Sequence, residues 1–245
     1  MNPLGQTRTT VRRNHALIAP DSHVLAALPD WEATRGVTQI TPAMGAGFVQ
    51  YVAHVEAGSS SAGAAPGVER FLFVKEGELQ VEGRDLRAGG YAYFPADRSH
   101  RISATGAGKV LVIEKVFEPP GKGPLPELVL GDEVGVSSTA FMGDPDAQLK
   151  LLLPDAPAFD MAVNIFTYRP GAMLPQVECH VMEHGLVMLQ GMGVYRLDDQ
   201  WYPVQAGDVI WMAPYCPQWF IAGGKQASRY IYYKDVNRAA MGVRR

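Results

Sequence analysis

The sequence predicts an all-β protein made of two copies of a small β-barrel. Three observations support this: β-prone runs are short and closely spaced, punctuating residues are frequent, and the two halves of the chain repeat one another. Glycine and proline account for 26 and 18 of the 245 residues, which leaves little room for long helices. Hydrophobic residues make up 47 %, which supplies a core and excludes a disordered chain.

The predicted strands come in two groups separated by a proline-rich stretch. Those of the first half are 48–55, 71–74, 78–81, 91–94 and 110–113, and those of the second half are 148–152, 161–166, 186–189, 193–195, 209–212 and 230–233. Residues 117–126 hold four prolines and two glycines, a composition typical of a linker. Short strands between Gly or Pro turns are typical of a sandwich or barrel. We therefore expect barrels over 1–117, with an N-terminal arm, and 137–245, joined by a linker over 118–136.

The two halves align on glycines. Gly77 follows one apolar run as Gly191 follows another, and Gly89 and Gly207 open the next strand in each half. Eleven residues beyond these second glycines stand His100 and Gln218. A tandem repeat of one barrel is the most economical architecture.

Charge and composition exclude several classes of partner. The net charge of −3 predicts no nucleic-acid partner. No apolar run approaches the ~18 residues of a membrane span, and no secretory signal is visible. Two cysteines do not make a disulfide framework, so we expect a cytoplasmic protein. The basic residues near the chain ends are interpreted as solvated tails: Arg8, Arg12, Arg13, Arg238, Arg244 and Arg245.

Residues 178–184 form the densest group of chemically active side chains. If this segment is a strand, Glu178, His180 and His184 share parity and point to one face, whereas Glu183 points outward or lies behind the ligands. A carboxylate with two imidazoles suits Mn, Fe, Zn or Ni. The alternative is a set of satisfied polar residues on a strand rim. Cys179 is expected to be a small packed residue, and packing is also favoured for Cys216.

A second group lies near the C-terminus. Tyr230, Tyr232 and Lys234 alternate along one strand face, which favours a shared surface. The alternatives are core packing with satisfied hydroxyls for the tyrosines and a surface salt bridge for Lys234.

The motif pattern resembles the cupin superfamily. Gly171, Glu178, His180, His184 and Gly191 match the first cupin motif, except that Glu stands where the first His is usual. The second motif is matched by Gly207, Pro214 and Gln218, with Gln in place of the usual His. Both departures, in the second half of a bicupin, resemble the (S)-ureidoglycine aminohydrolase family.

That resemblance implies a fold, a metal and a reaction. The fold is a tandem of cupin barrels, each a double-stranded β-helix or jelly roll. The implied Mn²⁺ ligands are Glu178, His180, His184 and Gln218. The implied substrate-binding and catalytic residues are Tyr195, Tyr230 and Lys234. The reaction converts (S)-ureidoglycine to (S)-ureidoglycolate and ammonia, in purine and allantoin catabolism, and cupins commonly form homo-oligomers.

In the N-terminal copy the metal site is predicted to be lost. Ala64, Pro66 and Arg70 stand where Glu178, His180 and His184 stand in the second copy, and only His100 survives. Two other functions remain open: another metal-dependent cupin enzyme, such as a dioxygenase or isomerase, and a non-enzymatic bicupin that binds a small ligand.

Overall fold

The computed structural model describes residues 6–119 and 124–236, and nearly all of their regular structure is β, as predicted. Three short 3-10 helices interrupt the strands: η1 (Pro20–Ser22), η2 (Pro42–Met44) and η3 (Glu133–Gly135). Within the described part of the chain, no helix is long and apolar enough to cross a membrane. The chain divides into two compact units, one formed by residues 23–136 and the other by residues 1–22 together with 137–245.

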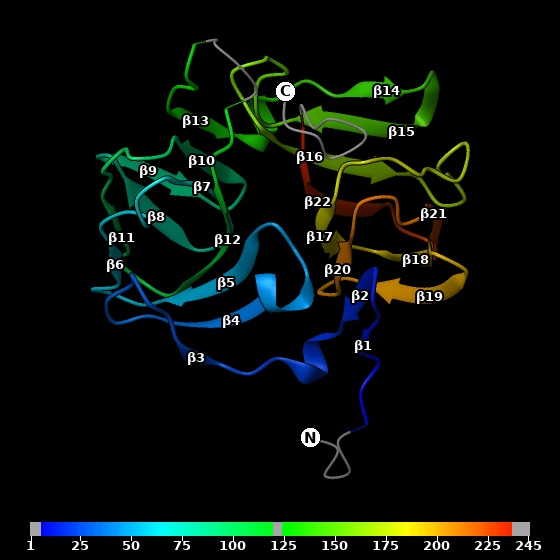
Figure 1. The fold of residues 1–245 in the computed structure, drawn as a ribbon, viewed down its shortest axis with the longest axis horizontal. Coiled ribbons are helices and arrows are strands. Elements are labelled where there is room, and N and C mark those ends of the chain that lie inside the picture. The colour runs from blue at the N-terminus through cyan, green and yellow to red at the C-terminus, as the bar shows by residue number, and fades with distance from the viewer. Residues whose placement is uncertain (1–5, 120–123, 237–245) are drawn as a thin grey trace. The chain divides into compact units, whose positions relative to one another are not determined.

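The unit of residues 23–136 contains two antiparallel sheets that enclose one apolar core (Figure 1). The larger sheet has the order β13 (Val129–Asp132), β10 (Gly90–Phe94), β7 (Val68–Glu76), β12 (Gly108–Val116), β5 (Val49–Val55), β4 (Arg35–Ile40), β3 (Ala26–Ala27). The smaller has the order β6 (Ser60–Ser61), β11 (Ile102–Ser103), β8 (Glu78–Val81), β9 (Arg84–Arg87).

The other unit repeats this plan, with one strand more in its larger sheet and one strand fewer in its smaller sheet. Its larger sheet runs β1 (Thr10–Val11), β2 (His15–Ile18), β20 (Val209–Met212), β17 (His184–Gln190), β22 (Ser228–Asp235), β16 (Met161–Tyr168), β15 (Asp144–Leu151), β14 (Thr139–Phe141). Its smaller sheet runs β19 (Gln200–Gln205), β18 (Met192–Leu197), β21 (Gln218–Gly223). Buried side chains of both sheets meet in one core.

Strand order confirms the predicted repeat. The neighbours β10, β7, β12 and β5 of one unit correspond to β20, β17, β22 and β16 of the other. The aligned glycines adopt the same left-handed backbone: φ is +80° at Gly77 and +77° at Gly191, +95° at Gly89 and +92° at Gly207. Glycine is required because a side chain is strained at such φ values.

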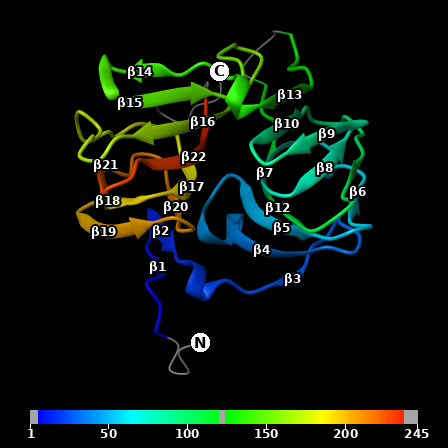
Figure 2. The same cartoon turned by 180° about the vertical axis from the view of Figure 1, so that it is seen from behind.

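The unit boundaries differ from the expected ones at the N-terminus. Residues 15–18 pair with β20, so the arm expected in the first barrel belongs with the second, as Figure 2 shows for β1 and β2. Arg8, expected in a solvated tail, makes two bonds of 2.6 and 2.9 Å to the buried Asp208 carboxylate. A local pattern cannot show this pairing, because its partners are 200 residues apart. Arg238, Arg244 and Arg245 lie outside the described residues.

The expected linker also holds structure. Its residues 129–132 form β13, which pairs with β10 and extends the larger sheet of the first unit. The linker is therefore shorter than 118–136, and its residues 120–123 lie outside the described part.

Candidate metal centre and substrate pocket

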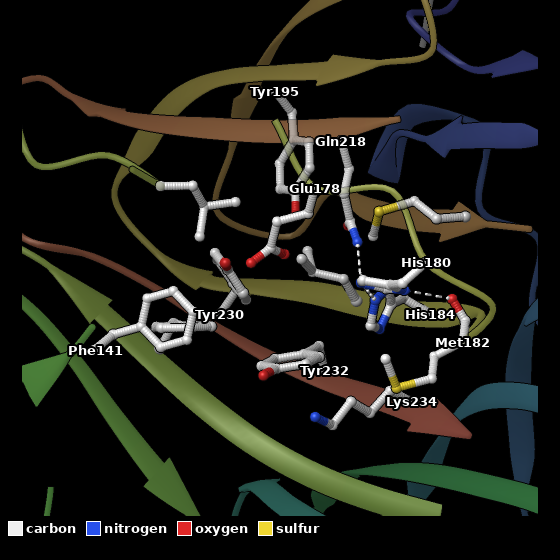
Figure 3. A pocket seen from close by; sticks show the side chains of 14 residues that line it. Phe141, Glu178, His180, Met182, His184, Tyr195, Gln218, Tyr230, Tyr232 and Lys234 are labelled. Atoms are coloured by element: carbon white, nitrogen blue, oxygen red, sulfur yellow. Dashed lines mark hydrogen bonds between the residues drawn. The ribbon is translucent and has the colours of Figure 1, made fainter. Parts of the chain in front are cut away.

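A pocket of about 180 Å³ lies inside the C-terminal barrel, between its two sheets (Figure 3). The seven residues predicted to bind metal or substrate all line it, and so does Tyr232. The complete lining is Phe141, Phe166, Leu174, Glu178, His180, Met182, His184, Leu186, Tyr195, Met212, Gln218, Tyr230, Tyr232 and Lys234. Sequence spacing and sheet register thus bring the two predicted groups together.

Sheet register explains why distant residues meet. His184 opens β17, where it stands opposite Lys234 of β22. Gln218 opens β21 and forms an isolated antiparallel bridge with Glu178, through backbone bonds of 2.8 and 2.9 Å. Backbone pairing therefore fixes the positions of both ends of the 178–184 segment.

The segment itself is not the strand that the parity argument assumed. Glu178 forms only that isolated bridge, and regular pairing begins at His184. Between them the chain is a loop, held where Tyr215 N donates to the His180 carbonyl at 2.7 Å. The shared orientation of the three side chains thus comes from a bridge, a loop and a strand start, and not from strand alternation.

The Nε2 atoms of the two imidazoles lie close together, in an arrangement suited to binding a cation. His180 Nδ1 lies 3.2 Å from the Met182 carbonyl, and His184 Nδ1 lies 3.2 Å from the Tyr233 carbonyl. A carbonyl only accepts, so each Nδ1 carries a proton and the Nε2 atoms are the ring nitrogens left for other partners. The two Nε2 atoms are 3.3 Å apart, so the two rings bring two imidazole nitrogens to one point. A divalent metal ion fits such a pair of donors.

Gln218 and Glu178 complete the donor set by different routes. Gln218 Nε2 donates to His180 Nε2 at 3.0 Å, and a half-turn of its amide directs Oε1 to the same point. Figure 3 shows the Glu178 carboxylate turned away from the imidazoles. Accordingly, among residues 6–119 and 124–236 no three His, Cys, Asp or Glu side chains converge as a metal-binding group. A change of Glu178 rotamer is needed to add its carboxylate to the imidazoles.

Burial sets the protonation states in the pocket. It lowers the pKa of His184 to about 3, with help from nearby His180 and Lys234, so this ring is neutral at pH 7. Burial raises the pKa of Glu178, opposed by His180 and Lys234. It also raises the pKa values of Tyr195, Tyr230 and Tyr232, which keeps these hydroxyls protonated.

Two further polar residues support the tyrosines, and the sequence analysis did not single them out. Tyr168 Oη lies 3.2 Å from Tyr230 Oη. Asn164 Nδ2 donates to Tyr232 Oη at 3.1 Å. Both belong to β16, whose register places them beside β22. The available signal was their shared parity with Phe166, although Tyr168 lies beyond the predicted strand 161–166, and only strand order shows which neighbour they meet.

The remaining expectations for this region concern Glu183 and the two cysteines, and the one for Cys179 is wrong. Glu183 is buried away from the pocket, where its carboxylate accepts from Trp211 Nε1 at 3.3 Å, in line with its opposite parity. Cys216 is buried as expected, but Cys179 is exposed, because it lies on the loop and not on a packed strand.

In the N-terminal unit an arginine occupies the position equivalent to His184. Arg70 is 1 % exposed, and its guanidinium bonds to Glu114 at 2.6 Å and to Ser61 at 2.9 Å. His100 Nε2 lies 3.2 Å from Arg70 Nη1, and burial beside this cation lowers the pKa of His100 to about 4. In this barrel the buried Arg70 guanidinium therefore lies among polar side chains.

Comparison with known proteins identifies the class and then the family. Residues 164–233 match the cupin domain family. The fold resembles that of oxalate decarboxylase from Lactobacillus farciminis, with a TM-score of 0.70 and 13 % identity over 94 % of this chain and 88 % of that one. With its two barrels, the protein is therefore a bicupin.

Closer relatives define the family. The chain is 42 % identical to the (S)-ureidoglycine aminohydrolase of Arabidopsis thaliana, over 96 % of this chain and 80 % of that protein. The crystal structure of protein Ylba from E. coli matches with a TM-score of 0.84 and 31 % identity, covering 96 % of this chain and 97 % of that one. The chain belongs to the (S)-ureidoglycine aminohydrolase family.

Proposed function

We propose that this protein is a Mn²⁺-dependent aminohydrolase that converts (S)-ureidoglycine and water to (S)-ureidoglycolate and ammonia, in ureide catabolism. The observation that supports this best is the close approach of His180 Nε2 and His184 Nε2, next to Gln218, Glu178 and Lys234 in one half-enclosed pocket. Membership of the family supplies the substrate class.

The proposed ligands are His180 Nε2, His184 Nε2, Gln218 Oε1 and the Glu178 carboxylate. This mixed nitrogen and oxygen set suits several first-row divalent ions, Mn²⁺ among them. When bound, the ion supplies Lewis-acid stabilisation of developing charge and lowers the pKa of bound water. The Nδ1–H bonds to the Met182 and Tyr233 carbonyls orient the imidazoles and fix their tautomers.

Lys234 is proposed to bind the substrate carboxylate. It is the cation of the pocket lining, and it stands directly opposite His184 in the sheet. An ion pair in this half-enclosed site orients the substrate so that its α-carbon faces the ligand cluster. Lys234 is also proposed to move a proton to or from the departing nitrogen.

Tyr195 and Tyr230 are proposed to bind the attacking water or the leaving amine. Their hydroxyls stay protonated at neutral pH because burial raises their pKa values, so they act as donors and acceptors without charge. In the overall reaction the C–N bond to the α-amino group breaks and a C–O bond to water forms. One proton leaves the water and one reaches the departing ammonia, so no oxidant is needed.

The N-terminal barrel is proposed to serve packing and assembly without a metal of its own. Arg70 places a permanent positive charge at the position equivalent to His184. A metal ion there would meet electrostatic repulsion from that guanidinium.

The test is ammonia release from freshly made (S)-ureidoglycine, corrected for the spontaneous rate, with and without added Mn²⁺. We expect metal-dependent release by the wild-type chain and a large rise in KM for Lys234→Met, because the substrate carboxylate loses its cation. Lys225→Met, which alters an exposed lysine outside the pocket lining, is the matched control. Absence of metal-dependent release would refute the proposal, and oxygen consumption by an iron-loaded protein would favour a dioxygenase instead.

A further inference from the structure

The hydroxyl of Tyr232 is held with a defined polarity. Asn164 Nδ2 is a donor, so it occupies a lone pair on Tyr232 Oη at 3.1 Å. The Tyr232 proton must therefore point elsewhere, and no second partner for this hydroxyl is seen among the described residues. Because Tyr232 lines the pocket, its O–H is directed toward the space that a ligand fills.

The ring that carries this hydroxyl is fixed by its neighbours. Phe166 stacks on Tyr232 with centroids 5.6 Å apart and an interplanar angle of 12°. The His184 imidazole meets it edge-on at a centroid distance of 5.6 Å. Tyr232 therefore presents a neutral donor at a set place, whereas either hydroxyl of the Tyr168–Tyr230 pair can be the donor.

Tyr232 and Lys234 form a two-point receptor. They are two residues apart on β22, so their α-carbons are about 6.6 Å apart on one face of the strand. Figure 3 shows both side chains extending from that strand toward the same side of the pocket. A cation and a neutral donor at this spacing match a small acid in which a carbonyl follows the carboxylate by a few bonds.

We propose that Tyr232, oriented by Asn164, donates to the ureido carbonyl of the substrate, while Lys234 binds its carboxylate. Tyr232 is then the residue that selects ureido acids, and Asn164 is a positioning residue that acts through it. This inference rests on the proposed function for its substrate class. It leaves Tyr195 and Tyr230 free for water and amine.

The test measures binding of an unreactive ligand to the full chain in the presence of Mn²⁺. N-carbamoylglycine has the carboxylate and ureido groups but no α-amino group to release, and pentanoate has only the carboxylate. We expect Tyr232→Phe to weaken N-carbamoylglycine binding about tenfold and to leave pentanoate binding within about twofold. Lys234→Met should weaken both. Tyr202→Phe, which loses a hydroxyl bonded to His15 outside the pocket lining, is the matched control and should change neither.

Asn164→Asp tests the polarity itself. A carboxylate only accepts, so it would draw the Tyr232 proton away from the pocket while keeping a hydrogen bond of similar length. We expect Asn164→Asp to weaken N-carbamoylglycine binding more than Asn164→Leu, which leaves the hydroxyl free to rotate. Melting temperatures check that each variant folds, and Tyr232→Phe decides the matter if the aspartate variant does not.

The inference is overturned if the wild-type chain does not bind N-carbamoylglycine, if Tyr232→Phe binds it with unchanged affinity, or if that variant weakens both ligands equally. Ammonia release is measured separately. Its absence refutes the proposed function, whereas the binding ratios judge the role of Tyr232 by themselves.

Discussion

His100 couples the stability of the N-terminal unit to pH. Burial beside Arg70 lowers its pKa to about 4, whereas an unfolded histidine titrates near 6.5. As pH falls below about 6.5, the unfolded chain takes up a proton that the folded chain refuses, so folding stability is lost down to about pH 4. We expect His100 to account for about 1–2 kcal/mol of the loss between pH 7.5 and 5.

The check is urea denaturation of the wild-type chain and His100→Gln at both pH values. Glutamine is the residue at the equivalent position of the other barrel, Gln218, and its oxygen can still accept from Arg70. The variant should lose less stability on acidification than the wild type. An identical loss in the two proteins would show that His100 does not titrate as described.

Individual site residues differ in how far sequence could predict them. Motif spacing predicted that His180, His184 and Gln218 belong to one site, and all three line the same pocket. The hydrogen bond between Tyr232 and Asn164 could not be predicted from the sequence, because it depends on the register between β16 and β22. Cys179 was wrongly expected to pack, because the parity argument placed it on a strand.

At the scale of elements, the repeated glycine turns are tightly specified. Gly191 has φ +77°, and a Cβ built on it would lie 2.7 Å from the Ala227 carbonyl oxygen. Gly143 has φ +87° but nothing within 4 Å of its Cβ position. We expect Gly143→Ala to cost about 1 kcal/mol from backbone strain alone and Gly191→Ala to cost at least about 2 kcal/mol more.

Thermal unfolding monitored by circular dichroism measures this difference. Equal melting temperatures for the two variants would mean that Ala227 and Ser228 move away from a Cβ at position 191 without cost. The close contact between them and Gly191 argues for a cost.

Strand positions were predictable because apolar runs and glycine turns alternate so regularly. The loop over 179–183 was not, since its composition favours a strand, and the tertiary bond from Tyr215 N to the His180 carbonyl holds it in another shape. Strand β13 was hidden for a similar reason. It lies in a stretch whose prolines favour a linker, and it pairs only because β10 offers it a free edge.

For the whole molecule, the N-terminal arm is part of the C-terminal unit. Residues 16–18 are buried against β20, and Arg8 neutralises the buried Asp208 carboxylate. No periodicity in the sequence indicates this, because the arm and its partner strand lie at opposite ends of the chain. The division into two barrels was predictable, but the pairing of the N-terminal arm with the C-terminal unit was not.

Deleting residues 1–18 should therefore destabilise the C-terminal unit by several kcal/mol, since three buried apolar side chains and one ion pair are lost. Arg8→Met should cost about 1–2 kcal/mol, because half of that pair is exposed. Tryptophan fluorescence reports on this unit when Trp31, which lies in the other unit, is replaced by Phe.

The fragment 23–136 serves as the control for the deletion. It lacks the arm in any case, so it should unfold as it does within the full chain. If the deleted chain melted like the wild type, the pairing of β2 with β20 would contribute nothing.

We propose that the second barrel holds one catalytic metal ion between His180 and His184. The most direct test strips the protein with a chelator, adds Mn²⁺ back in measured steps, and follows bound metal and ammonia release from (S)-ureidoglycine together. We expect both to saturate at one ion per chain. We also expect His184→Ala to bind no ion and to release no ammonia above the spontaneous rate, while His54→Ala behaves as wild type. Full ammonia release by the stripped protein, or by His184→Ala, would show that the reaction needs no metal ion at this site.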